Sequence, residues 1–278
     1  MEIDKFKLLS KIDSPEDLRY LGIDSLDELS SEIASLITET IKENGGHFSS
    51  PLGVIDLTLA LHYCYNTPLD KLFWDVGHQA YSHKIITGRK ELFNTIRKKN
   101  GISGFLKISE SPYDVFGAGH ASTSISAALG YAHGRDLKNS NEKVVAIIGD
   151  GSMTGGLAYE GINNLGYHRT QLTVVLNDNS MSISKSVGAL SKYLTRLSTN
   201  KTYNKVRDDI WRLTGKIPFS SKIRNLIRKT EGGLKTALTP GGLFEDLGIR
   251  YIGPIDGHNI REMIKTFKLV RSLKGPVL

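Results

Sequence analysis

Two long apolar runs in the middle of the chain flank a segment with a helical pattern. Residues 143–151 (KVVAIIGDG) and 171–179 (QLTVVLNDN) each hold an unbroken apolar stretch that gives way to glycine or polar residues. Such runs are typical of strands buried on both faces of a parallel sheet. Residues 156–166 (GLAYEGINNLG), between them, have the pattern of a helix. A strand, a helix and a strand within about 35 residues predict a βαβ unit with a right-handed crossover.

The segments on either side continue this alternation. Apolar residues recur at helical intervals from 26 to 41, and Ser25 and Glu28 have the spacing of a capping box. Further helices are expected over 52–64 and 122–134, a short strand over 71–76, and a strand, loop, helix and new strand over 249–278. We therefore predict an α/β fold, a three-layer α/β/α domain with a mostly parallel sheet. Its active site is expected at the carboxyl ends of the strands.

Composition narrows the class of protein. With 39% hydrophobic and 23% charged residues, the 278-residue chain has the balance of a soluble globular protein. No apolar run approaches the ~20 residues of a membrane helix, and the first residues lack the apolar core of a secretory signal. Cys64 is the single cysteine, which excludes an internal disulfide and fits a reducing compartment. We expect a cytoplasmic protein without a membrane segment.

The net charge of +7 is unevenly spread. Residues 182–240 hold 13 Lys and Arg against 3 Asp and Glu, which leaves 23 basic against 26 acidic residues elsewhere. We predict one domain over 1–278, from which residues 182–243 depart as a basic, irregular or mobile excursion. Nucleic-acid binding is the alternative for this segment, but it contains no nucleic-acid motif and few aromatics. A solvated surface segment, or a flap over the entrance of an anionic substrate, is favoured, so no nucleic-acid partner is expected.

Oxygen-bearing side chains follow both apolar runs. Asp150 lies between two glycines after the first run, and residues 177–179 (Asn-Asp-Asn) end the second. Ligands of parallel sheets bind beyond the carboxyl ends of the strands, where glycines let a backbone approach them closely. The oxygens of Asp150 and Asn179 suit Mg2+, which is commonly shared with phosphate oxygens. The pattern predicts that Asp150 holds Mg2+ and that the Mg2+ holds a diphosphate, although a lone Gly-Asp-Gly is also common in turns.

The 29 positions from Asp150 to Asn179 resemble the Gly-Asp-Gly…Asn signature of thiamine-diphosphate enzymes. Further stretches extend the resemblance: GGHFSSPLG (45–53), WDVGHQAYSHKIITGR (74–89), GISGFLKISES (101–111), GAGHASTSISAALG (117–130), GDGSMTGGLAYEGINNLG (149–166), LNDNSMSIS (176–184) and YIGPIDGHN (251–259). Over nearly the whole chain, these stretches in this order resemble the N-terminal half of the 1-deoxy-D-xylulose 5-phosphate synthase family. They separate the chain from transketolase and pyruvate dehydrogenase relatives.

The resemblance implies a transferase that depends on thiamine diphosphate and Mg2+. The family condenses pyruvate with D-glyceraldehyde 3-phosphate, releases carbon dioxide, and supplies isoprenoid, thiamine and pyridoxal synthesis. Most of that chemistry belongs to the cofactor, while the protein positions it and moves protons. The intact protein is expected to be a homodimer. Its pyrimidine-binding domain, which supplies the activating glutamate, and its C-terminal domain are expected beyond residue 278, so the chain alone should be inactive.

The same resemblance assigns roles to individual residues. Asp150 and Asn179 match the Mg2+ ligands, with the main-chain carbonyl of Met181. The residues matched to cofactor contacts are Gly151 and Ser152 at the diphosphate, with His78, Gly119, His120, Ala121 and Asn179. His47 matches a histidine near the thiazolium ring, where an imidazole suits proton transfer. Two positions depart from the family pattern, Ala121 where serine is usual and Asp56 where glutamate is commoner. The other histidines, such as His62, are interpreted as structural.

Two alternatives keep the same fold. One is a non-catalytic module that binds another phosphate ligand, and the retained Asp150 and Asn179 argue against it. The other is one half of a split transketolase-like enzyme. The apolar run at 275–278 favours a piece of a longer protein, because a natural split is expected in a loop.

Overall fold

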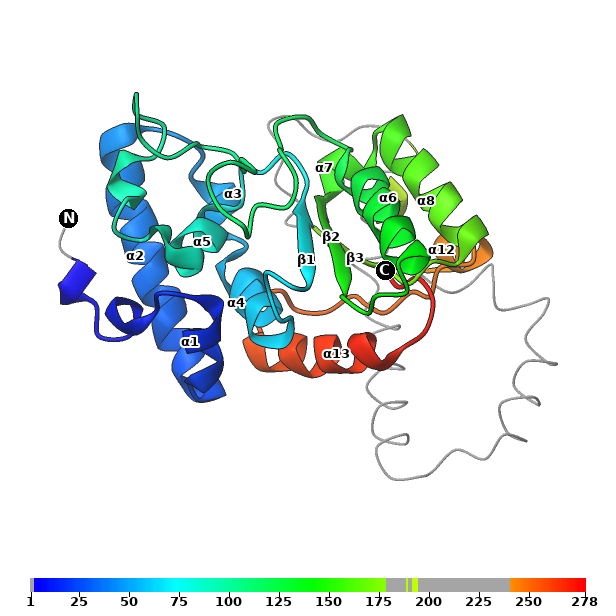
Figure 1. The fold of residues 1–278 in the computed structure, drawn as a ribbon, viewed down its shortest axis with the longest axis horizontal. Coiled ribbons are helices and arrows are strands. Elements are labelled where there is room, and N and C mark those ends of the chain that lie inside the picture. Colours follow the sequence, from blue (N-terminus) through cyan, green and yellow to red (C-terminus); the bar gives the residue numbers. More distant parts are fainter. Residues whose placement is uncertain (1–2, 179–188, 190–191, 195–240) are drawn as a thin grey trace.

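A parallel sheet lies at the centre of the molecule (Figure 1). The computed structural model describes residues 3–178, 189, 192–194 and 241–278. Strands β1 (Lys71–Trp74), β2 (Val144–Gly149) and β3 (Thr173–Asn177) pair in that order, all parallel. Beyond β3, Val277 forms parallel bridges with both Thr173 and Arg250. The sheet therefore continues through two short segments near the end of the chain, in agreement with the parallel topology predicted from the sequence.

The helices are, in chain order, α1 (Pro15–Tyr20), α2 (Leu26–Asn44), α3 (Ser49–Leu52), α4 (Ile55–Cys64), α5 (Tyr81–Lys84), α6 (Ser124–Leu137), α7 (Asp150–Met153), α8 (Gly156–His168), α12 (Gly242–Asp246) and α13 (Ile260–Ser272). Short 3-10 turns occur at η1 (Ile3–Lys5), η2 (Leu9–Lys11), η3 (Ile23–Ser25) and η5 (Phe93–Thr95), and a π turn at η4 (Ile85–Arg89). No helix in these described parts is both long and apolar enough to cross a bilayer.

The two faces of β2 explain its unbroken apolar pattern. Val145 and Ile147 point into a core shared with α2, α4 and α13, whereas Ala146 and Ile148 point into a second core beneath α6 and α8. Because both faces are covered, alternation of polar and apolar residues would place polar groups in one of the cores. The predicted three-layer α/β/α arrangement is confirmed, with helices on both sides of the sheet (Figure 1).

The start of α2 differs from the prediction. Ser25 precedes this helix, but its side chain makes no capping hydrogen bond, because η3 leads directly into the helix. A capping box instead forms at α1, where the Ser14 hydroxyl accepts from the Glu16 amide at 3.2 Å and Asp17 accepts from the Ser14 amide at 2.8 Å. The spacing predicted the helix correctly and the cap wrongly.

Other boundaries move by a few residues. The helix expected over 52–64 is divided into α3 and α4 at Gly53–Val54, and the strand expected over 71–76 ends at Trp74. The helix expected over 122–134 begins at Ser124, because Ser122 has a left-handed φ of 70°. Of the basic segment, only residues 189, 192–194 and 241–243 are described. The prediction of an irregular or mobile excursion there concerns residues outside the described chain and stays a prediction.

A buried polar network supports the face of the molecule that carries α4 and α5. His62 Nε2 lies 2.9 Å from His83 Nδ1, and His83 Nε2 lies 3.3 Å from Asp114 Oδ1. Arg89 donates two hydrogen bonds of 2.8 Å to the Asp114 carboxylate, and Lys84 pairs with Glu110. These contacts connect α4 and α5 to residues 103–114, the segment that precedes the loop at 117–121. His62 thus has the structural environment expected from its apolar helix.

Candidate active site

A tight turn follows β1 and presents His78. Val76 and Gly77 both have left-handed backbones, with φ of 58° and 85°. A Cβ atom on Gly77 would lie 2.9 Å from the Cβ of Ala118 and 3.3 Å from the Leu106 nitrogen. Glycine is required there because the turn lies directly against the segment that leads to α6. This close contact brings His78 towards the loop that contains Gly119.

His47 and His78 lie next to each other, although 31 positions separate them. Their ring centroids are 5.2 Å apart, and the Phe105 ring packs edge-to-face with His47 at a centroid distance of 6.2 Å. The Nδ1 atoms of both histidines are buried and have no hydrogen-bond partner among the described residues. An unpaired buried nitrogen costs free energy, so two such atoms in one place indicate a site for a polar ligand.

The environment keeps both imidazoles neutral at neutral pH. Burial, followed by the positive charge of Arg97, lowers the pKa of His47. Burial also lowers the pKa of His78, as does a charge on His47, while Asp75 acts in the opposite direction. A neutral imidazole has one nitrogen that accepts a proton and one that donates. The pair is therefore suited to proton transfer near neutral pH.

Asp150 begins α7 directly after β2 and interacts electrostatically with a second carboxylate, that of Asp178. Burial raises the pKa of Asp150, and the negative charge of Asp178 raises it further. Like charges held together favour protonation or a bound cation. Among the described residues, no atom lies within 4 Å of a Cβ added at Gly149 or Gly151. The Asp150 region thus fits a cation and an anionic ligand.

The predicted metal ligands are only partly visible. Asn179 and Met181 fall outside the described residues, so their placement beside Asp150 stays a prediction. Within the described part of the chain, no three His, Cys, Asp or Glu side chains gather as a metal site.

The loop before α6 exposes Gly119, His120 and Ala121. Gly119 has a φ of 154°, and no atom of the part of the chain that the structure describes lies within 4 Å of its Cβ position. Thr123 donates a hydrogen bond to the His120 carbonyl at 3.1 Å. The main chain of all three residues, and the side chains of His120 and Ala121, are therefore accessible to a ligand.

Two residues that the sequence did not single out join these turns. Asp75, buried at the end of β1, accepts hydrogen bonds from the Ser122 and Ser124 amides. Ser122 in turn donates to the Ser152 carbonyl at 2.7 Å. The available signal was the position of Asp75, a carboxylate directly after a buried strand, as Asp150 is. The structure thus brings the predicted residues His47, His78, Gly119–Ala121 and Asp150–Ser152 to one edge of the sheet.

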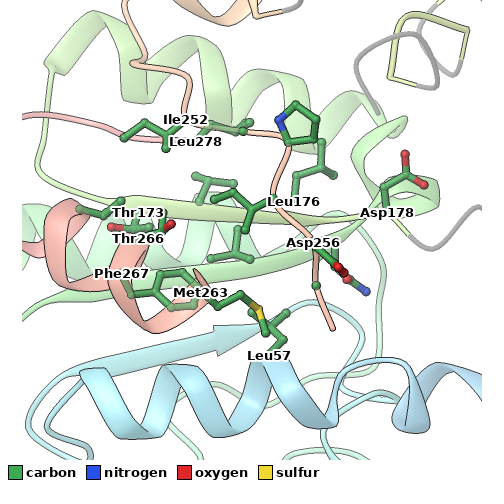
Figure 2. Close-up of a pocket in the computed structure, with 18 of the residues that line it drawn as sticks. Leu57, Thr173, Leu176, Asp178, Ile252, Asp256, Met263, Thr266, Phe267 and Leu278 are labelled. Carbon is green, nitrogen blue, oxygen red and sulfur yellow. The ribbon is translucent and has the colours of Figure 1, made fainter. Parts of the chain in front are cut away.

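A separate cavity of about 480 Å³ lies between β3 and residues 251–258 (Figure 2). Apolar side chains such as Leu57, Met263 and Phe267 line most of it, and Asn177 and Asp178 are among its polar lining residues. None of the predicted cofactor contacts among the described residues lines this cavity. It borders the candidate site at Asp178 and is distinct from the turns that carry His47 and Asp150.

Transketolases are among the solved structures with the same fold. The chain superimposes on transketolase from Campylobacter jejuni with a TM-score of 0.63 and 20% identity, covering 93% of this chain and 37% of that one. For transketolase from Leishmania mexicana the TM-score is 0.61 and the identity 15%, with 91% of this chain and 36% of that one covered. At these identities the comparison shows the fold alone.

Sequence comparison is more specific. Residues 9–278 match the family model described as 1-deoxy-D-xylulose-5-phosphate synthase. The 1-deoxy-D-xylulose-5-phosphate synthase of Halothermothrix orenii is 53% identical over 272 residues, 98% of this chain and 43% of that protein. The one of Chlorobaculum tepidum is 50% identical over 275 residues, 98% of this chain and 43% of that protein. The chain spans less than half the length of these curated relatives. It belongs to the 1-deoxy-D-xylulose-5-phosphate synthase family and corresponds to the N-terminal region of its members.

Proposed function

We propose that this chain is the Mg2+- and diphosphate-binding half of a thiamine-diphosphate-dependent enzyme that makes 1-deoxy-D-xylulose 5-phosphate from pyruvate and D-glyceraldehyde 3-phosphate. One observation carries the proposal. Two groups of side chains lie at the same edge of the sheet in this member of the family. One is Asp150 with the neighbouring carboxylate, and the other is the His47–His78 pair. Ligands of parallel α/β sheets bind at that edge.

Asp150 is the proposed anchor of the metal. Its carboxylate would hold Mg2+ together with the Asn179 amide oxygen and the Met181 main-chain carbonyl. A cation at this position would offset the repulsion between Asp150 and Asp178, which raises the pKa of Asp150. Gly151 and Ser152 would then face the diphosphate, and the open space at Gly151 supports this.

His47 is the proposed proton-transfer residue, and His78 lies beside it against the cofactor. When bound, thiamine diphosphate supplies the carbanion that joins the two substrates. His47 has a lowered pKa and a buried Nδ1 without a partner among the described residues, so it can accept a proton near neutral pH. His78 and the exposed Gly119–His120–Ala121 loop would contact the cofactor. Ala121 has no hydroxyl, so its contact would use the main chain.

The properties of the whole protein follow from the family and are proposed with it. The reaction would serve isoprenoid, thiamine and pyridoxal synthesis. The intact enzyme would be a cytoplasmic homodimer, completed by the domains that follow the matched region in the longer relatives. The single buried thiol of Cys64 supports the reducing compartment.

Complementation tests this function. The downstream half of the Halothermothrix orenii relative would be added as a separate chain, and product formation followed by mass spectrometry. The relative's own N-terminal half, added to the same downstream half, is the control for assembly. We expect product from this chain with the partner and none from this chain alone. His47→Asn should lower the rate by about a hundredfold or more. His168→Asn, at an exposed residue at the end of α8, should leave the rate unchanged. If the control pair makes product and this chain with the same downstream half makes none, the proposal is refuted.

A further inference from the structure

Ser122 lies at the junction of the loop before α6 and the turn after β2. Its φ of 70° is unusual for a residue with a side chain, and its exposed fraction is 8%. Such a left-handed backbone costs free energy and persists where surrounding contacts hold it. The contacts on each side of Ser122 are therefore informative.

On the first side, Asp75 holds the backbone of Ser122. The Asp75 carboxylate accepts from the Ser122 amide at 2.8 Å and from the Ser124 amide at 3.0 Å. Asp75 is itself fixed to the sheet, because its amide donates to the Ile147 carbonyl at 2.8 Å. A buried carboxylate with two amide donors is a strong anchor. The loop before α6 is thereby tied to β1 and β2.

On the second side, Ser122 holds the turn that contains Ser152. The Ser122 hydroxyl donates to the Ser152 carbonyl at 2.7 Å. Gly155 approaches so closely that a Cβ there would lie 2.2 Å from the Ser122 hydroxyl oxygen. Only glycine fits at 155, and the reason is steric, since its own backbone is extended. The turn over 150–155 therefore packs directly against Ser122.

We propose that Asp75 and Ser122 are positioning residues that fix the loop of Gly119–Ala121 against the turn of Asp150–Ser152. We call the Asp75–Ser122–Ser152 chain of hydrogen bonds the latch. Neither residue needs to touch the ligand. The latch sets the spacing between two groups of main-chain donors, as outer-shell partners do around metal sites. The identity of the ligand, a Mg2+-bound diphosphate, rests on the proposed function.

The chain offers a matched control at the opposite end of β1. Asp70 is also buried, and its carboxylate accepts from the Lys143 and Asn66 amides, each at 2.7 Å. Asp70 directly precedes β1 and Asp75 directly follows it, so two buried carboxylates with two backbone amide donors each lie at opposite edges of the sheet, and Asp70 has in addition an ion pair with Arg271 at 3.7 Å. Asp70→Asn should destabilise the fold without affecting the candidate site.

The experiment compares Asp75→Asn, Asp70→Asn and Ser122→Ala with the unaltered chain at a temperature where all four are folded. Hydrogen–deuterium exchange would be measured over 150–155, and the affinity for thiamine diphosphate with Mg2+ by calorimetry. An asparagine can accept from only one of the Ser122 and Ser124 amides, so one of the two hydrogen bonds that tie the start of α6 to residue 75 is lost. We expect faster exchange over 150–155 in Asp75→Asn and Ser122→Ala only. Affinity should fall by about tenfold or more in Asp75→Asn and be unchanged in Asp70→Asn.

Unchanged exchange over 150–155 in Asp75→Asn, or an equal rise in Asp70→Asn, would overturn the latch. Equal losses of affinity in the two Asp→Asn variants would overturn it as well, since the effect would then reflect general stability. If the unaltered chain binds no thiamine diphosphate, the proposed function fails in this chain. The exchange data still decide the latch in that case, because they need no ligand.

Discussion

At the scale of single residues, the candidate site contains a carboxylate whose surroundings lower the stability of the fold and favour the binding of a cation. Asp150 follows a buried strand and faces Asp178, and both its burial and this neighbour raise its pKa. A raised pKa means that the charged form is less stable in the folded chain than in the unfolded chain. Such arrangements are common where a protein is organised to receive a cation.

Asp150→Asn should therefore increase stability in the absence of metal. The expected gain is small, about 0.5 kcal/mol, because solvent screens a half-exposed carboxylate. Mg2+ with thiamine diphosphate should raise the unfolding temperature of the unaltered chain and leave that of the variant unchanged. Thermal unfolding with and without both ligands measures this. A variant that is less stable without ligand, or equally stabilised by it, would contradict the assignment.

The two neighbouring histidines should titrate below the ordinary value of 6.5. Imidazole NMR signals followed from pH 4 to 8 would give both midpoints. Because a charge on His47 lowers the pKa of His78, His47→Asn should raise the His78 midpoint. An unchanged or lower His78 midpoint in that variant would show that the two rings do not interact as their separation indicates.

Some of these residues could be found from sequence and others could not. Asp150, His47 and His78 each lie beside glycine in stretches shared with the family, so local sequence was sufficient. Asp75 and Ser122 are 47 positions apart, and their hydrogen bond exists only because β1 and the start of α6 meet in the fold. No local pattern encodes that contact.

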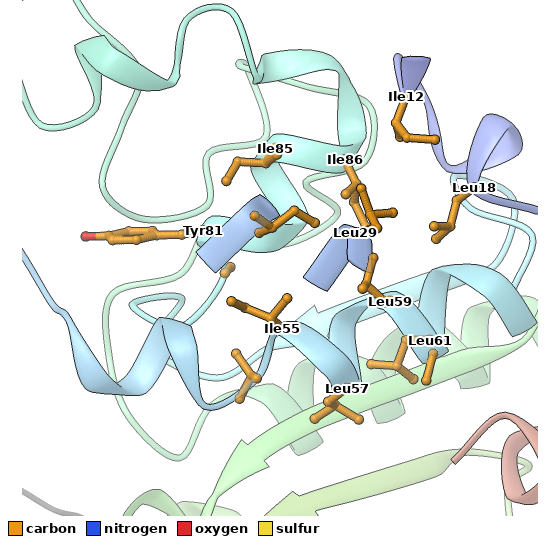
Figure 3. Packing of buried hydrophobic residues seen from close by; sticks show 14 of the residues in the cluster. Ile12, Leu18, Leu29, Ile55, Leu57, Leu59, Leu61, Tyr81, Ile85 and Ile86 are labelled. Atoms are coloured by element: carbon orange, nitrogen blue, oxygen red, sulfur yellow. The ribbon is translucent and has the colours of Figure 1, made fainter. Parts of the chain in front are cut away.

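At the scale of helices and strands, the hydrophobic pattern predicted the type of each element better than its first and last residues. α4 is buried on nearly all sides, with Leu57 and Leu61 on one side of the helix, towards the sheet, and Leu59 on the other (Figure 3). An apolar sequence without a polar face predicts a buried helix but gives no information about its ends. The break at Gly53–Val54 and the end of β1 at Trp74 depend on turns whose left-handed or compact backbones are stabilised by tertiary contacts.

The two capping sequences provide a test at this scale. Ser14→Ala should cost about 1 kcal/mol of unfolding free energy, because it removes the capping box of α1. Ser25→Ala should cost less than about 0.5 kcal/mol, because the Ser25 side chain caps nothing. Chemical denaturation of both variants makes the comparison. A larger loss of unfolding free energy for Ser25→Ala than for Ser14→Ala would show that Ser25 caps α2, as the sequence predicted.

At the scale of the whole molecule, topology could be predicted and the buried polar network could not. The βαβ pattern gave parallel neighbours, and β2 and β3 pair as expected. The network of His62, His83, Asp114 and Arg89 brings together residues from α4, α5, η4 and the 103–114 segment. Its members are ordinary polar residues in the sequence, and only the fold removes them from water.

This network predicts acid sensitivity. Burial lowers the pKa of His62 far below 6.5 and also lowers that of His83, so both are neutral in the folded chain. The unfolded chain binds protons at these histidines first, so stability is complete above about pH 6.5 and falls as the pH decreases. Each histidine contributes up to about 1.4 kcal/mol per pH unit between 6.5 and its folded pKa. Denaturation curves at pH 7.5, 6.5, 5.5 and 4.5 measure this. Constant stability between pH 6.5 and 4.5 would contradict it.

The central claim is that this chain holds a diphosphate through a metal at Asp150. Calorimetric titration of the purified chain with thiamine diphosphate, with and without Mg2+, tests it most directly, with Asp150→Ala beside it. We expect binding that requires Mg2+ and disappears in the variant. Absence of binding in the presence of Mg2+, binding of equal strength without Mg2+, or unchanged binding in Asp150→Ala would contradict it.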